Sequence, residues 1–500
     1  MHFASLTVDP AFRVGPVDPR LYGSFVEHLG RCVYEGIYEP GHPTADAHGF
    51  RGDVAALTRE LGVPIVRYPG GNFVSGYNWE DGIGPVASRP TRIDLAWRSV
   101  EPNHVGVDEF QRWVGSVGAS TMMAVNLGTR GLDAARNFVE YCNHPSGTYW
   151  SDQRRAHGSL DPYDIKVWCL GNEMDGPWQI GHKTAEEYGR LAAETGKAMR
   201  LVDPSIELVA CGSSSRAMPT FGSWEATVLR ETYEVADYVS MHAYYQERDG
   251  DRGSFLASAV DMDAFIDAVI ATADHVRAVG RHRKRINISF DEWNVWYQTR
   301  FVGEKNLSIS RTPRLIEDVY SVTDAVVVGN LLISLLRHAD RVRIGCQAQL
   351  VNVIGLIMTE PGGPAWRQSS YHPFALTSRY GRGTVLRLEP RGPVYDTAAH
   401  GEVPVLDAVA VLADEPSGGV TVFAVNRDQH QELTLDVDAR SLPSLTSASH
   451  VTLSDDDPDA VNDATQPNRV VPRQLDPPKL DGGRLQAVLP PLSWNMLRLT

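Results

Sequence analysis

Short apolar segments rich in β-branched residues alternate with longer amphipathic segments over residues 20–354. The amphipathic segments, such as residues 108–117, 184–201 and 262–279, have the spacing of apolar positions typical of surface helices. The last of them should begin near Asp261, because aspartate often caps helix N-termini. Strands that alternate with helices predict a parallel sheet, and eight such units in about 330 residues predict a (β/α)8 TIM barrel. The predicted strands are residues 21–29, 63–68, 121–127, 165–173, 206–211, 238–245, 285–294 and 342–354.

The pattern changes near residue 380, where helical periodicity almost disappears and short strand-like segments are separated by turns rich in proline and aspartate. This pattern is typical of an antiparallel β-sandwich. We therefore predict an α/β chain with a barrel over residues 18–380 and an additional C-terminal, jelly-roll-like β-sandwich over residues 381–500. A strand from residues 1–17 is expected to join the sandwich. Examples of the strand-like segments in the C-terminal part are residues 405–412, 420–425, 433–437 and 485–489.

The composition is that of a soluble globular protein with a sizeable core, since 42% of the 500 residues are hydrophobic and 22% are charged. A formal net charge of −15 argues against nucleic acid and anionic membranes as partners. The five cysteines are scattered and include no Cys-x-x-Cys pair, which favours reduced thiols. The N-terminal sequence lacks the regions of a signal peptide, and no segment approaches the roughly 20 apolar residues of a membrane span. We therefore expect a cytoplasmic protein.

Two of the predicted strands deliver a glutamate at or near their ends. Residues 165–173 end on Glu173, and residues 285–294 carry Glu292. Chemistry in a TIM barrel lies at the C-terminal ends of the strands, so both carboxylates are expected to face one pocket. Cleavage of a glycosidic bond needs such a pair, one acid to protonate the leaving oxygen and one carboxylate to attack or to activate water. The sequence leaves open whether their separation is that of a retaining or an inverting enzyme.

Five segments at the ends of predicted strands add a more specific signal. They are residues 23–28, 67–73, 171–179, 291–296 and 348–352. In this order they resemble the α-L-arabinofuranosidases of glycoside hydrolase family 51. The resemblance implies a retaining exo-enzyme that releases terminal non-reducing α-L-arabinofuranosyl residues from arabinoxylan or arabinan oligosaccharides by double displacement. It also implies a barrel with a β-sandwich, no metal or other cofactor, and a homo-oligomer, usually a hexamer.

The resemblance assigns roles to the two glutamates. Glu173 corresponds to the general acid/base, which must be protonated when substrate binds, and Glu292 corresponds to the nucleophile, which must be ionised. Arg67 in the second predicted strand could stabilise the charged form of Glu292, or it could be a buried structural arginine. His242 is expected to orient neighbouring groups rather than to carry protons.

The same resemblance implies a set of substrate-binding residues. These are Glu27, Asn72, Asn172, Tyr244, Trp296 and Gln349. Asn172 corresponds to a residue that hydrogen-bonds the 2-hydroxyl of the sugar, and Tyr244 to a tyrosine that contacts the nucleophile and the ring. Trp296 is expected to form one wall of the pocket, while Trp178 could either stack on a sugar or pack in the core.

One segment departs from the family pattern. Three alternative functions also remain open. Residues 95–104 resemble a family loop in which threonine is expected where this chain has Pro102, so the leaving-group side of the pocket could differ. A metallohydrolase is disfavoured because the chain has no His-x-His or His-Glu-x-x-His pattern. A β-xylosidase or endo-β-glucanase on the same barrel would share both glutamates. A non-catalytic sugar-binding protein should have lost one of them.

Overall fold

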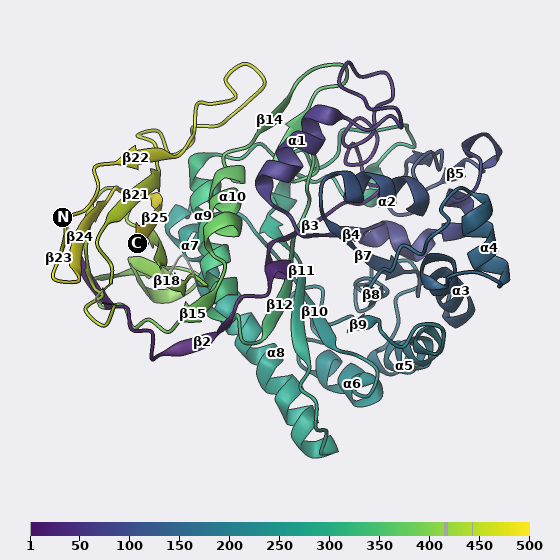
Figure 1. Cartoon of the computed structure of the whole chain (residues 1–500), viewed down its shortest axis with the longest axis horizontal. Coiled ribbons are helices and arrows are strands. Elements are labelled where there is room, and N and C mark those ends of the chain that lie inside the picture. Colours follow the sequence, from purple (N-terminus) through teal and green to yellow (C-terminus); the bar gives the residue numbers. More distant parts are fainter. Residues whose placement is uncertain (1, 415–418, 443) are drawn as a thin grey trace.

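The computed structural model describes residues 2–414, 419–442 and 444–500. A barrel surrounded by helices lies beside a smaller β-rich part, and both chain ends lie in the β-rich part (Figure 1). The ranges predicted for the sandwich include residues 1, 415–418 and 443, which lie outside this description.

Eight parallel strands close into a barrel in which neighbours in the chain are neighbours in the sheet and the last strand pairs with the first. Nearly every residue of these strands is buried, because helices cover the outer face and side chains fill the interior. The strands are β3 (Gly23–Phe25), β4 (Ile65–Tyr68), β7 (Ser120–Val125), β8 (Val167–Leu170), β9 (Glu207–Ala210), β10 (Tyr238–Tyr245), β11 (Asn287–Val295) and β12 (Val342–Gln347). The predicted barrel is therefore confirmed.

Several barrel strands end earlier than predicted. β3 ends at Phe25 rather than at residue 29, and β12 ends at Gln347 rather than at residue 354. β8 ends at Leu170, since the backbone leaves the sheet at Gly171. The φ of Gly171 is +89°, a conformation that favours glycine.

Helices connect the strands and cover the barrel. They are α1 (Gly52–Leu61), α2 (Val107–Ser116), α3 (Leu132–Asn143), α4 (Tyr149–Ala156), α5 (Ala185–Val202), α6 (Ser223–Thr232), α7 (Arg252–Leu256), α8 (Ser258–Gly280), α9 (Val322–Arg337) and α10 (Tyr371–Tyr380). The three helices predicted as examples correspond to α2, α5 and α8, but the expected start of α8 near Asp261 is wrong. Asp261 lies in the first turn, and its carboxylate pairs with Arg216 at 2.7 Å instead of capping the helix.

Two sheets form the β-rich part and pack against each other. In spatial order, the strands of the smaller sheet are β1 (His2–Thr7), β20 (Leu433–Asp438), β24 (Arg484–Leu489) and β23 (Leu480–Asp481). Those of the larger sheet are β2 (Arg13–Pro16), β15 (Thr384–Leu386), β18 (Leu406–Leu412), β19 (Val420–Asn426), β25 (Ser493–Leu499), β21 (Ala448–Leu453) and β22 (Arg473–Leu475). Their facing side chains, among them Leu435 and Leu497, form a core separate from that of the barrel. β1 pairs with β20 and β2 with β15, so the N-terminal residues contribute to both sheets. The domain limits at residues 380 and 381 stay a prediction.

Helix α9 joins the two parts, because it is buried along nearly its whole length and contacts β11 of the barrel as well as β18, β19 and β25. Its apolar residues therefore cover all sides of the helix. In the described part of the chain, three two-stranded ribbons complete the fold: β5 (Arg92–Ile93) with β6 (Val100–Glu101), β13 (Ile357–Thr359) with β14 (Ala365–Arg367), and β16 (Val394–Thr397) with β17 (Gly401–Pro404).

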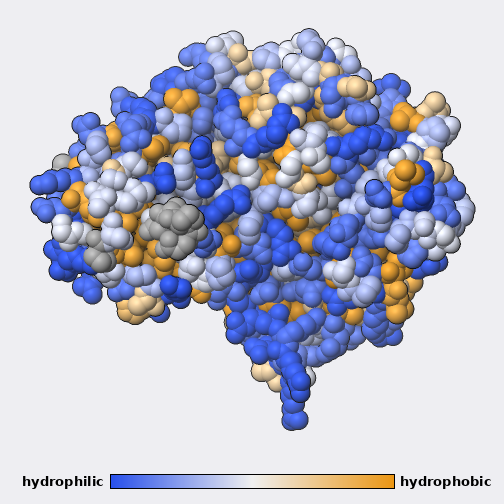
Figure 2. All heavy atoms as spheres, in the orientation of Figure 1, coloured by the Kyte–Doolittle hydropathy of each residue, from blue (hydrophilic) through white to orange (hydrophobic). Residues whose placement is uncertain are grey.

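The face drawn in Figure 2 is covered mainly by hydrophilic residues, with hydrophobic ones scattered among them. Among the described residues, no helix is both long enough and apolar enough to cross a membrane. All five cysteines are buried as free thiols.

Candidate active site

Glu173 lies in a tight turn just after β8. Its φ is +43°, which is uncommon for a residue with a side chain, and its carbonyl accepts a hydrogen bond from the backbone amide of Gly176 at 2.9 Å. The indole of Trp178 donates to Oε2 of Glu173 at 2.8 Å. Strained backbone of this kind concentrates at functional sites, where the surrounding structure holds it in place.

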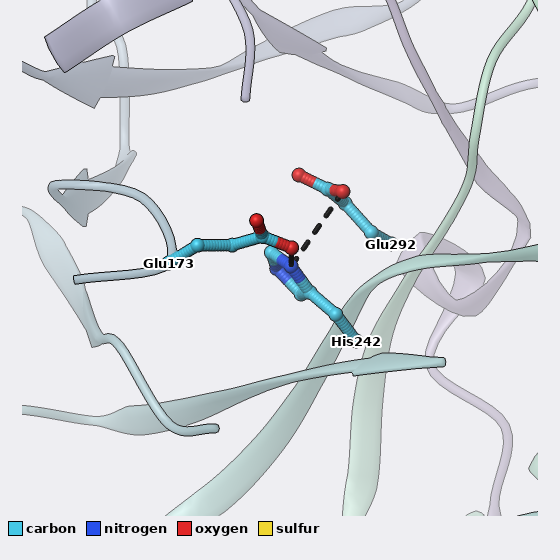
Figure 3. A group of neighbouring side chains, drawn as sticks. All are labelled: Glu173, His242 and Glu292. Carbon is cyan, nitrogen blue, oxygen red and sulfur yellow. Dashed lines mark hydrogen bonds and ion pairs between the residues drawn. The ribbon is translucent and has the colours of Figure 1, made fainter. Parts of the chain in front are cut away.

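His242 and Glu292 are partners across the β10–β11 pair, so their side chains lie next to each other. Figure 3 shows Glu173 and Glu292 converging on the imidazole of His242. Nδ1 of His242 lies 2.8 Å from Oε1 of Glu173 and 3.5 Å from Oε2 of Glu292. One oxygen of each carboxylate lies within 4.8 Å of the other. The structure therefore brings the two predicted carboxylates together, at a separation closer to the roughly 5–5.5 Å of retaining glycosidases than to the 6.5–9.5 Å of inverting ones.

The carboxylate of Glu292 is buried among groups that stabilise its charged form. Arg67 donates from Nη1 to Oε1 at 2.7 Å, and the hydroxyl of Tyr244 donates to Oε2 at 2.7 Å. The pKa of Glu292 is raised, because burial and the nearby charge of Glu173 outweigh the positive charges of His242 and Arg67 and the hydroxyl of Tyr244, which favour the ionised form. An ionised carboxylate held by such donors is suited to nucleophilic attack.

Both ring nitrogens of His242 face carboxylates, because Nε2 lies 3.1 Å from Oδ1 of Asp291 while Nδ1 faces Glu173. Burial lowers the pKa of His242, but the charge of Glu292 and the hydrogen bonds to Asp291 and Glu173 outweigh burial and raise the pKa to about 10. The imidazole is therefore protonated at neutral pH and donates from both nitrogens. A ring held in this way fixes the positions of the carboxylates around it.

Close to Glu292, a second buried carboxylate is surrounded by hydrogen-bond donors. Oε1 of Glu27 accepts from the backbone amide of Phe73 and from the indole of Trp97, both at 2.9 Å. Oε2 accepts from Nε2 of Gln349 at 3.1 Å. Burial raises the pKa of Glu27 to about 8 despite these bonds. Within the described residues Oε1 of Gln349 is buried and has no partner, so this amide keeps an acceptor for a hydroxyl group.

A pocket of about 450 Å³ includes most of the predicted residues in its walls. Those that line it are Glu27, Asn72, Glu173, Tyr244, Glu292, Trp296 and Gln349. Asn172 does not line the pocket. It is buried, with Oδ1 accepting from Nη2 of Arg67 at 2.7 Å and Nδ2 donating to Oδ1 of Asn72 at 3.4 Å. Its expected hydrogen bond to a sugar hydroxyl stays a prediction.

Two family domains match the sequence. The Alpha-L-arabinofuranosidase 1 domain matches residues 57–264, and the Alpha-L-arabinofuranosidase C-terminal domain matches residues 291–493. The chain belongs to the α-L-arabinofuranosidases of glycoside hydrolase family 51. The family predicted from the five sequence segments is therefore confirmed, and the chain is a glycoside hydrolase.

Individual proteins that are similar to this family 51 member support the same family. An intracellular exo-α-(1→5)-L-arabinofuranosidase of Streptomyces lividans is 60% identical over 100% of this chain and 75% of its own length. An enzyme of the same name from Bacillus subtilis is 54% identical over 100% of this chain and 99% of its own length. The solved structure of a family 51 α-L-arabinofuranosidase from Bifidobacterium longum matches with a TM-score of 0.95 and 49% identity, covering both chains completely.

Several residues that line the pocket of this family 51 enzyme were not predicted from the sequence. Trp97 lines the pocket. It lies in the same loop as Pro102, where the sequence departs from the family pattern, but that departure did not indicate that Trp97 reaches the pocket. Trp178, whose role was left open, also lines the pocket and is 46% exposed. Ser214 and Met218 line it from the loop after β9, where a glycine followed by three serines could have indicated a functional loop.

Asp175 connects this loop to the turn that carries Glu173. Its Oδ2 accepts hydrogen bonds from the amide and the hydroxyl of Ser214 at 3.1 and 3.2 Å. Burial raises the pKa of Asp175 to about 6, although the amide of Ser214 opposes the rise. The position of one wall of the pocket is thus tied to the turn that holds the predicted acid/base.

Proposed function

We propose that the chain is a retaining exo-α-L-arabinofuranosidase in which Glu173 is the acid/base and Glu292 is the nucleophile. The observation that carries this proposal is the convergence of the two carboxylates, one oxygen of each lying within 4.8 Å of the other beside a single pocket. Such a spacing leaves little room for the water molecule that an inverting enzyme holds between its general base and the anomeric carbon. Membership of the family supports the choice of sugar.

In the first step, Glu292 attacks the anomeric carbon and forms a glycosyl ester, while the bond to the leaving oxygen breaks. Glu173 gives its proton to that oxygen and is left as a carboxylate. Arg67 and Tyr244 hold the two oxygens of Glu292 in place, so the attacking atom does not have to be oriented during the reaction. His242 keeps both carboxylates near the same point.

In the second step, the carboxylate of Glu173 takes a proton from a water molecule, which attacks the anomeric carbon. The ester bond to Glu292 breaks, and arabinose leaves with its original anomeric configuration. We assign the binding of sugar hydroxyls to Glu27, Asn72 and Gln349, since each offers polar atoms to the pocket. Nδ2 of Asn172 has a second N–H besides the one that it donates to Asn72, and we assign that N–H to a sugar hydroxyl, directly or through a water molecule.

We propose (1→5)-linked arabinan oligosaccharides as the preferred substrate, with arabinoxylan oligosaccharides as a second group. Five relatives between 48% and 60% identical are named exo-α-(1→5)-L-arabinofuranosidases, and one that is 51% identical is named an exo-α-(1→6) enzyme. A pocket of about 450 Å³ is of the size of small-molecule sites and supports attack on chain ends. Rates on 1,2-, 1,3-, 1,5- and 1,6-linked disaccharides, with β-xylosides and β-glucans as controls, test both statements.

We also propose an intracellular location, because several relatives carry that word in their names. A hexamer is proposed from the family resemblance, and sedimentation velocity of the purified chain tests it. A monomer or dimer at micromolar concentration would argue against the hexamer.

The assignment of the nucleophile can be tested by trapping the glycosyl-enzyme. A mechanism-based arabinofuranose reagent that carries a good leaving group should label one peptide, and mass spectrometry should place the sugar on Glu292. A label on any other residue would contradict the assignment. The variant Glu292→Gln should incorporate no label.

A further inference from the structure

The two proposed catalytic carboxylates both lie near Nδ1 of His242, and this arrangement is also suited to binding a metal ion. Glu173, His242 and Glu292 each offer one metal-ligand atom, and these three atoms lie within 4.8 Å of one another (Figure 3). Zinc binds imidazole nitrogens and carboxylate oxygens, and sites with three protein ligands leave the fourth position to water. We propose that this cluster binds a divalent transition-metal ion such as Zn²⁺ as an inhibitor, not as a cofactor.

Two of the three distances in the cluster are already near those of a zinc site, and the two carboxylate oxygens, which lie within 4.8 Å of each other, would have to approach. Ligand atoms of a tetrahedral Zn²⁺ site, each about 2.0–2.2 Å from the metal, lie about 3.4 Å from one another. Nδ1 of His242 lies 2.8 Å from Oε1 of Glu173 and 3.5 Å from Oε2 of Glu292. Both glutamates line the open pocket, so an ion has a path to the cluster and water has room to complete its coordination.

The charges around the cluster also favour a divalent ion. The carboxylates of Glu173, Asp291 and Glu292 all lie around His242, and Arg67 pairs with two of them, Asp291 and Glu292. Three carboxylates beside one guanidinium form an acidic cluster that attracts a divalent ion.

The ligand set also predicts which ions bind. An imidazole nitrogen suits Zn²⁺ and Cu²⁺, whereas Mg²⁺ and Ca²⁺ prefer sites made of oxygen atoms alone. An ion held between Glu173 and Glu292 blocks both the proton donor and the nucleophile. The inhibition rests on the proposed function, but the binding does not, so the two can be tested separately.

His338 provides a matched control elsewhere in the molecule. It also lies between two carboxylates, but Asp263 faces Nε2 at 3.1 Å and Asp267 faces Nδ1 at 3.8 Å. The two carboxylates therefore stand at opposite sides of the ring and do not share a point where an ion could bind both.

Calorimetric titration of the full chain with Zn²⁺, without substrate, tests the binding. The parent should bind one ion at this site. The variants Glu173→Gln and Glu292→Gln should each bind it at least about tenfold more weakly, as even the loss of an outer-shell partner costs tenfold or more. His338→Gln should bind as the parent does. Equal affinity in the parent and both glutamine variants would overturn the proposal.

Crystals soaked in Zn²⁺ provide a second test that does not depend on how the variants fold. An anomalous peak between Glu173, His242 and Glu292 is expected, and a peak only at other places would overturn the proposal. In kinetic assays Zn²⁺ should compete with the arabinofuranoside, while Mg²⁺ at the same concentration should have no effect. A parent chain that binds Zn²⁺ at this site but turns over no arabinofuranoside would contradict the proposed function and leave the metal site standing.

Discussion

Replacing Tyr244 with phenylalanine isolates one hydrogen bond to the proposed nucleophile. The ring would keep its edge-to-face contact with Trp296, at a centroid distance of 5.1 Å. The hydroxyl that donates to Oε2 of Glu292 at 2.7 Å would be lost. The substitution therefore removes a donor to the carboxylate while the shape of the pocket changes by one oxygen atom.

The size of the effect follows from the charge of the acceptor. A hydrogen bond to a charged group contributes about 1.5–3 kcal/mol, so kcat/KM should fall about 10- to 150-fold at about 1.4 kcal/mol for each factor of ten. The hydroxyl of Tyr244 lowers the pKa of Glu292, and its removal should raise that pKa. Protonation of the nucleophile stops the reaction, so the acidic limb of the pH profile should move to higher pH.

The assay is kcat/KM for p-nitrophenyl α-L-arabinofuranoside across the acidic and neutral pH range. Tyr245→Phe is the matched control, because Tyr245 is the next residue of β10 and its hydroxyl donates to Asp261 at 3.3 Å. The control should keep the rate and the acidic limb of the parent. A fall of less than about threefold in Tyr244→Phe, or an acidic limb that stays in place, would refute the reasoning.

Three further predictions follow from the same geometry. Glu173→Ala should still form the glycosyl-enzyme from a substrate with a good leaving group, and azide should restore turnover because it attacks without a general base; failure of any azide rescue would count against the acid/base role. Asp175→Asn should raise KM for 1,5-arabinobiose about fivefold, because the hydrogen bonds to Ser214 that hold one wall of the pocket are weakened; an equal rise for the nitrophenyl substrate would speak for a general loss of structure. Leu435→Ala should lower the free energy of unfolding by about 2–5 kcal/mol, as seen by denaturant titration, and leave kcat/KM unchanged, since Leu435 lies in the separate core of the β-rich part.

The barrel could be predicted because its strands are apolar on both faces. Segments such as Val167–Leu170 are completely buried, and a continuous apolar run of this length between helical segments is a strong signal. The strand Ser493–Leu499 was not predicted. It carries Asn495, a polar residue that is buried because Oδ1 pairs with His450 at 3.0 Å, and a single sequence does not reveal such a partner.

The part of the candidate site that could be predicted from the sequence consists of residues that lie in short motifs at strand ends and whose side chains carry the chemistry themselves. Glu173 and Glu292 were found in this way, and the structure places them at one pocket. Trp97 and Ser214 were not predicted, because both lie in loops, and the path of a loop decides whether its side chains reach the pocket. The hydrogen bond from Trp97 to Glu27 forms only because the loop that carries Trp97 folds over the barrel mouth, and no local sequence pattern predicts that path.

The most direct test of the central claim follows the configuration of the first product. Proton NMR of the early reaction with an α-L-arabinofuranoside should show α-arabinofuranose forming first and its other forms appearing later by mutarotation. This result is expected if Glu173 and Glu292 act on the same sugar in two displacements. Early appearance of the β-anomer would mean a single displacement and would contradict the account.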